Sequence, residues 1–301
     1  QPNSSSSSFF LLGIPGLEAF SSSLGILLCS GYVVGLLGNG LVLLVLGQAR
    51  GLREPVHCLL AMLALLDLLM LTCVLPKLLA VLWLGWQEIG QGACFLQMFL
   101  VHCSTCQQSG VLVAMALDRY LAVCHPLRHR AILSSPVLAR LGLAIVLRGV
   151  LLVVPLAGML SRLPYCHSRL LPHSYCEHLA VLQLACADPR PWGLYSLACS
   201  SLVVGMDLAL IALSYGMILR AILGKGCCWK ASSTCGCHLS VVLLYYIPGL
   251  LSIYCQYFSS RVSTRAQVLL ADLYLILPSV LNPIIYSLRS RQIQQAMLSL
   301  I

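Results

Sequence analysis

The chain contains 301 residues, of which 59% are hydrophobic and only 9% are charged. A soluble globular protein carries roughly 25% charged residues, so this composition excludes a protein whose surface faces mostly water. The net charge of +9 is not concentrated on one basic face, and we therefore also exclude a nucleic-acid-binding protein.

Seven apolar stretches follow one another along the chain. Each is long enough to cross the ~30 Å apolar core of a bilayer as a helix that rises ~1.5 Å per residue. They cover residues 24–46, 58–82, 94–123, 137–160, 194–223, 238–258 and 268–288. We therefore predict an all-α membrane protein with a seven-transmembrane helix bundle. We find no internal repeat, which disfavours a transporter built from inverted repeats.

The distribution of positive charge predicts the orientation of the bundle, because an excess of Lys and Arg marks the cytoplasmic side. One alternate set of loops and helix ends carries Arg50, Arg53, Arg128, Arg130, Arg140, Arg220, Lys225, Lys230, Arg289 and Arg291. The opposite set carries fewer basic residues and most of the soluble acids. The N-terminus is then outside and the C-terminus inside.

This orientation divides the chain into three parts. Residues 1–23 form an extracellular tail, residues 24–288 form the membrane domain with a long extracellular loop at 161–193, and residues 289–301 form a cytoplasmic segment with a short amphipathic helix. The tail lacks the basic start of a signal peptide, so we expect none to be cleaved. Asn3 begins a glycosylation sequon on the predicted outer side.

The 16 cysteines fall into groups with different expected roles. Four lie on the predicted outer side, where disulfides persist: Cys94, Cys166, Cys176 and Cys186. Four cysteines allow three pairings, and the spacing does not choose among them. Seven lie in apolar stretches and are expected to be small core residues: Cys29, Cys58, Cys73, Cys103, Cys106, Cys199 and Cys255. Palmitoylation is one interpretation of Cys227 and Cys228 in a basic inner loop.

The third stretch carries polar side chains at both ends. His102, Thr105, Cys106 and Ser109 are spaced by three and four residues, so they share one helix face in the outer half. This stripe suits either a ligand pocket or hydrogen bonding between helices. At the inner end, Asp118 and Arg119 form a charged pair, which is a functional-site candidate by default in a membrane helix.

Other spans contain polar groups that need partners inside the bilayer. Asn39, Asp67 and Asn282 lie at mid-span depth, and Gln108 lies about 15 Å deeper than Asp118 by helix rise, near the expected depth of Asp67. Tyr246 is too deep in the sixth span for the interfacial aromatic belt, and it shares a face with Tyr257.

Further charges and prolines interrupt the apolar stretches. These charges, in or near the spans, are Lys77, Arg148, Asp207 and Asp272. We expect Lys77 and Arg148 to extend toward the bilayer surface and Asp272 to reach the outer mouth of the bundle. The prolines at positions 76, 155, 248 and 283 predict kinks, which are either ordinary packing or hinges between two states.

No group of residues predicts catalysis or metal binding. Ser109 lacks a suitably placed histidine for an intramembrane protease. His238 follows Cys235-Gly236-Cys237 without a second pair of metal ligands. We therefore predict that the protein is not an enzyme and needs no cofactor.

Several motifs resemble those of odorant receptors, a branch of the rhodopsin-like G-protein-coupled receptors. The most specific is MALDRYLAVCHPLRH, which starts at Met115. Others are Gly38-Asn39 in the first span, Leu66-Asp67-Leu68 in the second, the Lys230–His238 stretch before the sixth, and Asn282-Pro283-Ile284-Ile285-Tyr286 in the seventh. The stretch Phe10–Leu17 and the long loop are similar to the class I, fish-like group.

The resemblance implies a function and a set of sites. It implies disulfides Cys94–Cys176 and Cys166–Cys186, and a pocket for a small volatile or organic ligand at His102, Thr105, His178, Tyr246, Ile253 and Tyr257. It implies a switch toward a heterotrimeric stimulatory or olfactory G protein at Asp118, Arg119, Tyr120, Asn282, Pro283 and Tyr286. A rise in cyclic AMP and a location in the plasma membrane, in cilia of sensory neurons, are further implications.

Two departures limit what the resemblance implies. We group Asn39, Asp67 and Gln108 as an intramembrane polar network. Gln108 stands where the family usually has a glutamate beside the acid that Asp67 matches, so sodium binding near Asp67 is not implied. Tyr257 stands where some class I receptors have an arginine that binds carboxylates, so a neutral ligand is as well supported as an acid. The alternative from another class is a transporter or channel, in which Asp67 and Asp272 would line the conduction path.

Overall fold

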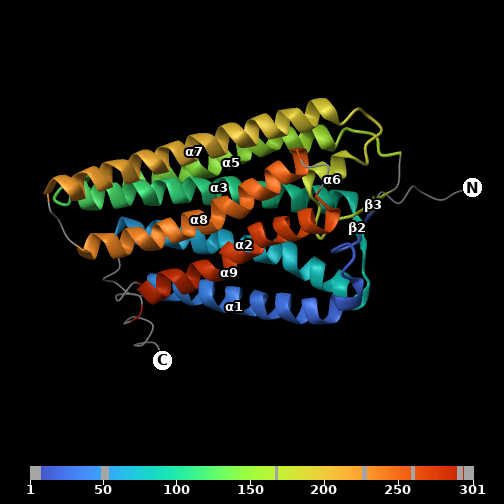
Figure 1. Ribbon diagram of the computed structural model, residues 1–301, viewed down its shortest axis with the longest axis horizontal. Coiled ribbons are helices and arrows are strands. Elements are labelled where there is room, and N and C mark those ends of the chain that lie inside the picture. Colours follow the sequence, from blue (N-terminus) through green and yellow to red (C-terminus); the bar gives the residue numbers. More distant parts are fainter. Residues whose placement is uncertain are drawn as a thin grey trace, which may run out of the picture.

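The computed structural model describes residues 8–48, 54–166, 169–225, 229–258, 262–289 and 294. Within these residues, seven helices are long and apolar enough to cross a membrane. They are α1 (Ser21–Gln48), α2 (Pro55–Leu84), α3 (Gln91–Cys124), α5 (Ser135–Leu160), α7 (Arg190–Lys225), α8 (Trp229–Phe258) and α9 (Thr264–Arg289). Figure 1 shows them running side by side along the long axis of the molecule. Each of the seven predicted spans lies within one of these helices, and the predicted bundle is confirmed.

Six short elements connect or cover the long helices. They are β1 (Ser8–Leu11), the 3-10 helix η1 (Glu18–Phe20), β2 (Glu88–Gly90), α4 (His129–Ile132), β3 (Leu170–Leu171) and α6 (His178–Leu182). Figure 1 places β2, β3 and α6 at one end of the bundle, which the charge pattern predicts to be the extracellular end.

Local sequence signals explain where the long helices begin and end. α2 begins at Pro55, where a proline costs no hydrogen bond because the first helical N–H groups have no partner within the helix. It ends at Gly85, which adopts a left-handed conformation with φ of 64°. Prolines also lie inside α2, α5, α8 and α9, and each helix continues through them. Membrane helices tolerate such prolines when neighbouring groups satisfy the freed carbonyls.

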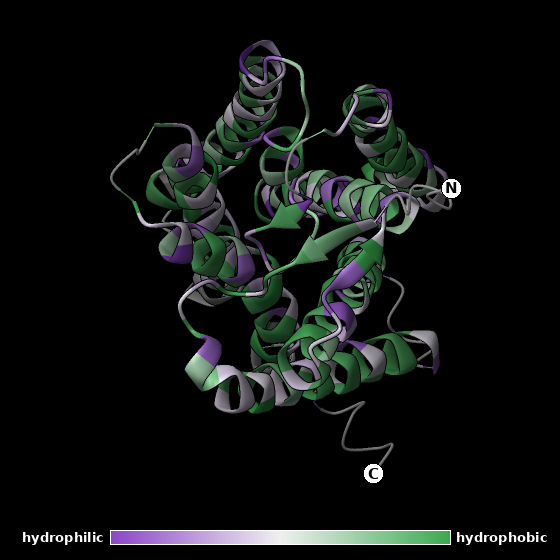
Figure 2. Cartoon of the chain, turned by 90° about the vertical axis from the view of Figure 1, so that its right-hand side faces the viewer, coloured by the Kyte–Doolittle hydropathy of each residue, from purple (hydrophilic) through white to green (hydrophobic). Residues whose placement is uncertain are grey.

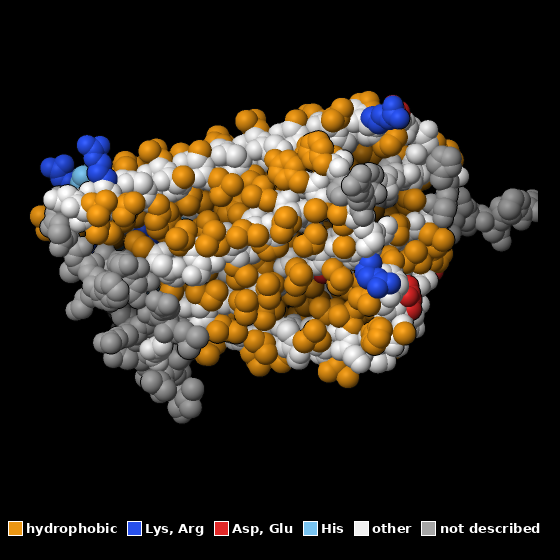
Figure 3. All heavy atoms as spheres, in the orientation of Figure 1, with side chains coloured by type: hydrophobic (Ala, Val, Ile, Leu, Met, Phe, Trp, Pro, Cys, Tyr) orange, Lys and Arg blue, Asp and Glu red, His pale blue; other side chains and the backbone are white. Residues whose placement is uncertain are grey.

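The outer surface of the bundle is apolar over its middle. Leu37, Leu151 and Leu202 on α1, α5 and α7 expose 68%, 69% and 72% of their surface, as expected of side chains that face lipid. Figure 3 shows apolar side chains along the middle of one face, with most of the visible charges toward the two ends. The interior is organised around α3, which is the most buried of the seven spans, whereas α1 is the least buried.

A three-stranded sheet crosses the extracellular end, and we did not predict it. Its strand order is β2-β1-β3, with β1 antiparallel to β2 and parallel to β3. Figure 2 shows these strands lying across the end of the helix bundle. The residues that we interpreted only as an extracellular tail therefore include a structural element. Phe9 and Leu11 of β1 are buried in one cluster with Cys94 and Cys176.

Of the seven cysteines expected in the core, only Cys103 is buried, and five are half-buried: Cys29, Cys73, Cys106, Cys199 and Cys255. Cys58 is exposed rather than in the core, because it lies on the lipid-facing side of α2, where a small apolar side chain is equally well tolerated. Asn3, Cys227, Cys228 and the expected amphipathic helix after Arg289 lie outside the described residues, except for Gln294.

Candidate functional site

A cavity of about 180 Å³ lies in the extracellular half of the bundle, between α3, α5, α7 and α8 and against α6. It is larger than the ~150 Å³ engineered cavity that accepts benzene and smaller than pockets of ~300 Å³ or more that hold drug-sized ligands. The structure brings all six residues of the expected pocket to its lining: His102, Thr105, His178, Tyr246, Ile253 and Tyr257. Its size and lining suit a small organic molecule.

The polar stripe of α3 faces this cavity and also bonds to neighbouring helices. His102, Thr105, Cys106 and Ser109 all line the cavity. The Tyr245 hydroxyl of α8 donates to the Thr105 carbonyl at 2.6 Å, and the Ser109 hydroxyl lies 3.0 Å from the Tyr246 hydroxyl. The two interpretations of the stripe, as a pocket wall and as an inter-helix contact, therefore both apply.

Two imidazole rings meet at the extracellular end of the cavity. The rings of His102 on α3 and His178 on α6 lie edge to face, with centroids 6.1 Å apart. Burial, with a further contribution from His102, lowers the pKa of His178 to about 3, so His178 is neutral at physiological pH. Glu177 holds His178 in place because its side chain caps α6, accepting a hydrogen bond from the N–H of Ala180 at 2.8 Å.

The His102 ring contains an unsatisfied atom. Its Nε2 is buried and has no hydrogen-bond partner among the residues that the structure describes. Leaving a buried polar group without a partner costs about 1–3 kcal/mol. Among the described residues that line the cavity, no other has a buried side-chain nitrogen or oxygen without a hydrogen-bond partner.

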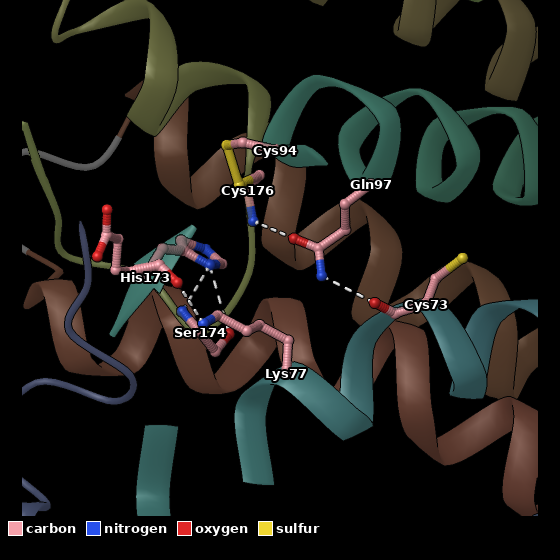
Figure 4. Close-up of a disulfide and its surroundings, with 8 residues drawn as sticks. Cys73, Lys77, Cys94, Gln97, His173, Ser174 and Cys176 are labelled. Carbon is pink, nitrogen blue, oxygen red and sulfur yellow. Dashed lines mark hydrogen bonds between the residues drawn. A yellow bond between two sulfur atoms is a disulfide. The ribbon is translucent and has the colours of Figure 1, made fainter. Parts of the chain in front are cut away.

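The extracellular loop is fixed over the cavity by covalent and polar contacts. Disulfides join Cys94 to Cys176 and Cys166 to Cys186. Beside the first, Gln97 of α3 accepts a hydrogen bond from the Cys176 N–H at 2.9 Å (Figure 4). The Gln97 amide in turn donates to the carbonyl of Cys73 on α2.

The loop also bonds to α9. The Ser174 hydroxyl donates to Asp272 Oδ1 at 2.6 Å, and Asp272 is buried. Asp272 therefore reaches the extracellular mouth as expected, and its contact there is with the loop. Together with the contacts of Gln97, this bond ties the loop to α2, α3 and α9, so the loop is a fixed cover of the cavity.

An ion pair between a half-buried arginine and a fully buried acid lies beneath the cavity. Arg148 of α5 donates to Asp207 of α7, with Nη1 2.8 Å from Oδ1. Ser109, which lines the cavity, hydrogen-bonds to Asp207 and Tyr246. The expectation that Arg148 extends to the bilayer surface is wrong, because a fully buried acid on the neighbouring helix pairs with it. Sequence reasoning named Asp207 only as a charge within a span. Arg148 and Asp207 carry opposite charges at similar depths in their spans, and this was the signal that could have predicted the pair.

Lys77 of α2 behaves as expected of a long basic side chain near a helix end. Its ammonium group donates to the carbonyls of Trp86 and Glu88, at 2.7 and 2.6 Å, in the extracellular connection that follows α2. Its charge is therefore carried toward the bilayer surface, in contrast to that of Arg148.

At mid-depth, Asp67 of α2 binds two amide groups. Gln108 Nε2 donates to Oδ1 at 2.8 Å, and Asn282 Nδ2 donates to Oδ2 at 2.9 Å. Asn39 is not part of this set, although we grouped it there. Its amide donates instead to the carbonyls of Gly35 and Ser279. The polar contacts therefore form two neighbouring groups, of which one joins α2, α3 and α9 and the other joins α1 and α9.

The cytoplasmic end of α3 holds the charged pair. Arg119 Nη2 lies 3.1 Å from Asp118 Oδ2, and His129 Nε2 of α4 lies 2.8 Å from Asp118 Oδ1. Asp118 is buried, so its carboxylate is shared between Arg119 and the short helix that follows. Tyr120 contacts His125, with its hydroxyl 3.3 Å from Nε2.

The other expected switch residues lie on α9, which packs against α1, α2 and α8. Tyr286 donates from its hydroxyl to the sulfur of Met115 on α3 at 3.8 Å. Pro283 packs against Gly38 of α1, where an added Cβ would come within 2.9 Å of the proline ring. The glycine therefore permits the close approach of α1 and α9.

Sequence reasoning missed the contact that holds the cytoplasmic half of α8. His238 is buried, its Nε2 lies 3.1 Å from the Leu112 carbonyl of α3, and its Nδ1 lies 2.7 Å from the Tyr215 hydroxyl of α7. We considered His238 only as a metal ligand. His238 lies inside a span, four residues after the polar Lys230–Thr234 stretch. A polar side chain at that depth needs a partner on another helix, and this was the signal for a structural role.

Comparison with known proteins identifies the family. The sequence profile of the family described as olfactory receptor matches residues 28–301. The human proteins olfactory receptor 52I2 and olfactory receptor 52I1 are each 45% identical to the chain, over 96% and 97% of it and 83% and 91% of their own lengths. Human olfactory receptor 51E2 is 41% identical over 99% of the chain and 94% of its own length.

These similarities fit the class I resemblance and favour a receptor over the transporter or channel alternative. They cover the cavity, the fixed extracellular loop and the charged pair of α3 alike. With its seven apolar helices, the chain belongs to the olfactory receptor family and is a multi-pass odorant receptor of the plasma membrane, not an enzyme.

Proposed function

We propose that the cavity of this receptor is its odorant site and that ligand binding there activates a stimulatory or olfactory G protein, which raises cyclic AMP. The ligand contacts are His102, Thr105, His178, Tyr246, Ile253 and Tyr257. Asp118, Arg119, Tyr120, Asn282, Pro283 and Tyr286 change their contacts when the receptor is activated.

The observation that carries this proposal is the hydrogen-bonded floor of the cavity. Ser109 and Tyr246 line the cavity and also bond to each other, and Ser109 bonds to Asp207 of α7. A ligand that displaces Tyr246 thereby changes the contacts between α3, α7 and α8. A ligand shifts the equilibrium between two arrangements of the receptor only if it binds one of them more tightly than the other. We expect this difference in affinity to arise at the floor of the cavity.

Movement of α8 would connect the cavity to the cytoplasm. In the arrangement seen, Arg119 is held by Asp118, and His238 holds the cytoplasmic half of α8 against α3. An outward movement of that half would break the second contact and open a cytoplasmic surface beside Arg119. A G protein that bound there would stabilise the open arrangement.

The test is a cyclic AMP assay in cells that express the full-length receptor, with a panel of small odorants. We expect at least one compound to raise cyclic AMP in a concentration-dependent manner and Arg119→Ala to abolish the response at equal surface expression. Transport of the ligand, or ionic current in cells without the G protein, would contradict the proposal.

The pocket assignment has a separate test. We expect His102→Ala to shift the potency of the active odorant without loss of surface expression, whereas Leu96→Ala, on the exposed face of the same helix, leaves it unchanged. Identical concentration–response curves for His102→Ala and the unaltered receptor would remove His102 from the site.

A further inference from the structure

We propose that the preferred ligands are small, uncharged alcohols, whose hydroxyl group bonds to both His102 and His178. This inference rests on the proposed function, because it names the class of compound that the cavity takes. It is carried by the hydrogen-bonding capacity, the charge and the size of the cavity.

The first argument is which polar groups of the cavity lack a partner. The hydroxyls of Thr105 and Ser200 donate to carbonyls of their own helices, and the hydroxyls of Ser196 and Tyr257 bond to each other. The buried Nε2 of His102 has no partner within the described part of the chain. Ser252 and Gln256 also line the cavity. We place the polar end of the ligand at His102, because a ligand gains most where it satisfies a buried group that is otherwise unsatisfied, and the ring of His178 lies beside it.

The second argument is the kind of group that fits two imidazoles. None of the ion pairs among the described residues includes His102 or His178, and a buried charge without a partner is strongly disfavoured, so both rings are neutral. A neutral imidazole has one N–H donor and one bare acceptor nitrogen. A hydroxyl group both donates and accepts, so it can accept from one ring and donate to the other. An ether can only accept, and an ammonium group can only donate.

The third argument is charge. None of the described residues that line the cavity is Lys or Arg, and the nearest guanidinium beneath it, Arg148, is bound to Asp207. The lining does contain one acid, Glu177, which is buried and already caps α6. A carboxylate ligand would therefore meet no counter-charge and would lie in the same cavity as Glu177. An amine could pair with Glu177 only at the expense of the cap that positions His178.

The fourth argument is size and shape. One part of the wall beyond the histidines is aliphatic and consists of Leu152, Leu156, Val203, Leu250 and Ile253. The volume of about 180 Å³ is close to that of the cavity of ~150 Å³ that accepts benzene. A compound with one six-membered ring or a short chain and a single hydroxyl group satisfies both conditions.

The experiment measures the thermal stabilisation of the purified full-length receptor by four compounds with one skeleton. They are cyclohexylmethanol, its methyl ether, cyclohexanecarboxylic acid and cyclohexylmethylamine, each titrated to give an apparent Kd. We expect the alcohol to bind at least fivefold more tightly than each of the other three. The same series is tested for cyclic AMP responses in cells.

The variants test the two histidines. His102→Phe and His178→Phe keep an aromatic ring and remove its hydrogen bonding, and each is expected to weaken alcohol binding about fivefold to tenfold, as the loss of one hydrogen bond predicts. His102→Gln, which keeps a donor and an acceptor, is expected to retain binding within threefold and also serves if the Phe variant does not fold. Tyr195→Phe, outside the cavity lining, is the matched control and is expected to change nothing.

The outcomes separate this inference from the proposed function. If the acid, amine or ether binds most tightly, if none of the four binds, or if alcohol binding is indifferent to both histidines, the inference is overturned. In each of these cases the receptor can still raise cyclic AMP with other odorants, and the proposed function then stands. If the alcohol binds in a histidine-dependent manner but no odorant raises cyclic AMP, the inference stands and the proposed coupling fails.

Discussion

Arg148 and Asp207 show how a single contact determines what a residue does in this protein. An arginine in a membrane span usually extends toward the surface, where water stabilises its charge. Arg148 instead lies beside a fully buried acid on the neighbouring helix, directly beneath the ligand cavity. The pair therefore joins α5 to α7 and positions Ser109.

Removing one partner of this pair should be more damaging than removing both. Arg148→Leu leaves Asp207 buried without a counter-charge, and we expect a loss of about 3–5 kcal/mol in the free energy of unfolding. The double variant Arg148→Leu/Asp207→Leu should recover most of that loss. Thermal unfolding of the purified receptor measures both, and a double variant as unstable as the single one would contradict this account.

Two buried histidines of the extracellular loop predict a dependence of stability on pH. Burial lowers the pKa of His173 and of His178 to about 3, whereas an unfolded histidine titrates near 6.5. Below about pH 6.5 the unfolded chain therefore binds protons that the folded chain does not. The free energy of unfolding should fall by roughly 1.4 kcal/mol per pH unit for each histidine.

We expect the Tm of the purified receptor to fall between pH 7.5 and pH 5 for this reason. The variant His173→Gln/His178→Gln should show a flatter profile. Burial raises the pKa of Glu177, which acts in the opposite direction, but Glu177 is present in both proteins. Parallel Tm profiles for the two proteins would show that these histidines do not titrate as described.

At the scale of elements, β1 converts the extracellular tail into part of the fold. It lies between β2 and β3, and its alternation places Phe9 inside and Phe10 outside. Phe9 packs against Tyr165 with ring centroids 5.2 Å apart, in the cluster that contains the Cys94–Cys176 disulfide. The strand therefore supports the loop that covers the ligand cavity.

The two phenylalanines provide a matched test of this role. Phe9→Ala removes a fully buried ring, and such changes cost about 3–5 kcal/mol, so we expect lower surface expression and a lower Tm. Phe10 is 37% exposed, and Phe10→Ala should have a much smaller effect. Equal effects of the two substitutions would indicate that the strand is not packed as seen.

At the scale of the whole molecule, α3 connects the two functional ends. Its extracellular half lines the cavity from His102 to Ser109, and its cytoplasmic end carries Asp118 and Arg119. Between them, the Leu112 carbonyl contacts His238 of α8, so the position of α8 is tied to α3 halfway along the path. The ligand cavity and the cytoplasmic surface are therefore coupled through contacts between these two helices.

His238→Phe should raise the basal activity of the receptor. It removes the hydrogen bonds to Leu112 and Tyr215 that hold the cytoplasmic half of α8 inward, so the closed arrangement loses stability relative to the open one. We expect higher cyclic AMP without odorant, compared at equal surface expression. Ser240→Ala, which removes only a bond within α8, is the control, and an unchanged or lower basal level for His238→Phe would contradict the role.

The sequence pattern alone was sufficient to predict the bundle and the polar face of α3 that lines the cavity. Membrane-spanning stretches are recognisable without tertiary information, because a helix in lipid satisfies its own backbone and must present apolar side chains. The face shared by His102, Thr105 and Ser109 follows from helical periodicity in the same way. Tertiary structure decided the partners of the polar groups, because partners on different helices depend on the rotation and depth of each helix.

The sequence predicted that Gln108 lies near the depth of Asp67, because depth follows from helix rise alone. It placed Arg148 at the bilayer surface and left Asp207 without a role, because their contact depends on how two helices pack. It also left β1 unrecognised, since four residues carry too little periodicity to predict a strand whose neighbours are 80 and 160 residues away. The amino-acid sequence by itself determined that this chain crosses the membrane seven times with a polar face toward the interior. Only the packing of the helices decided which buried groups meet, because a desolvated charge or imidazole is stabilised by whatever side chain the fold brings within hydrogen-bond distance.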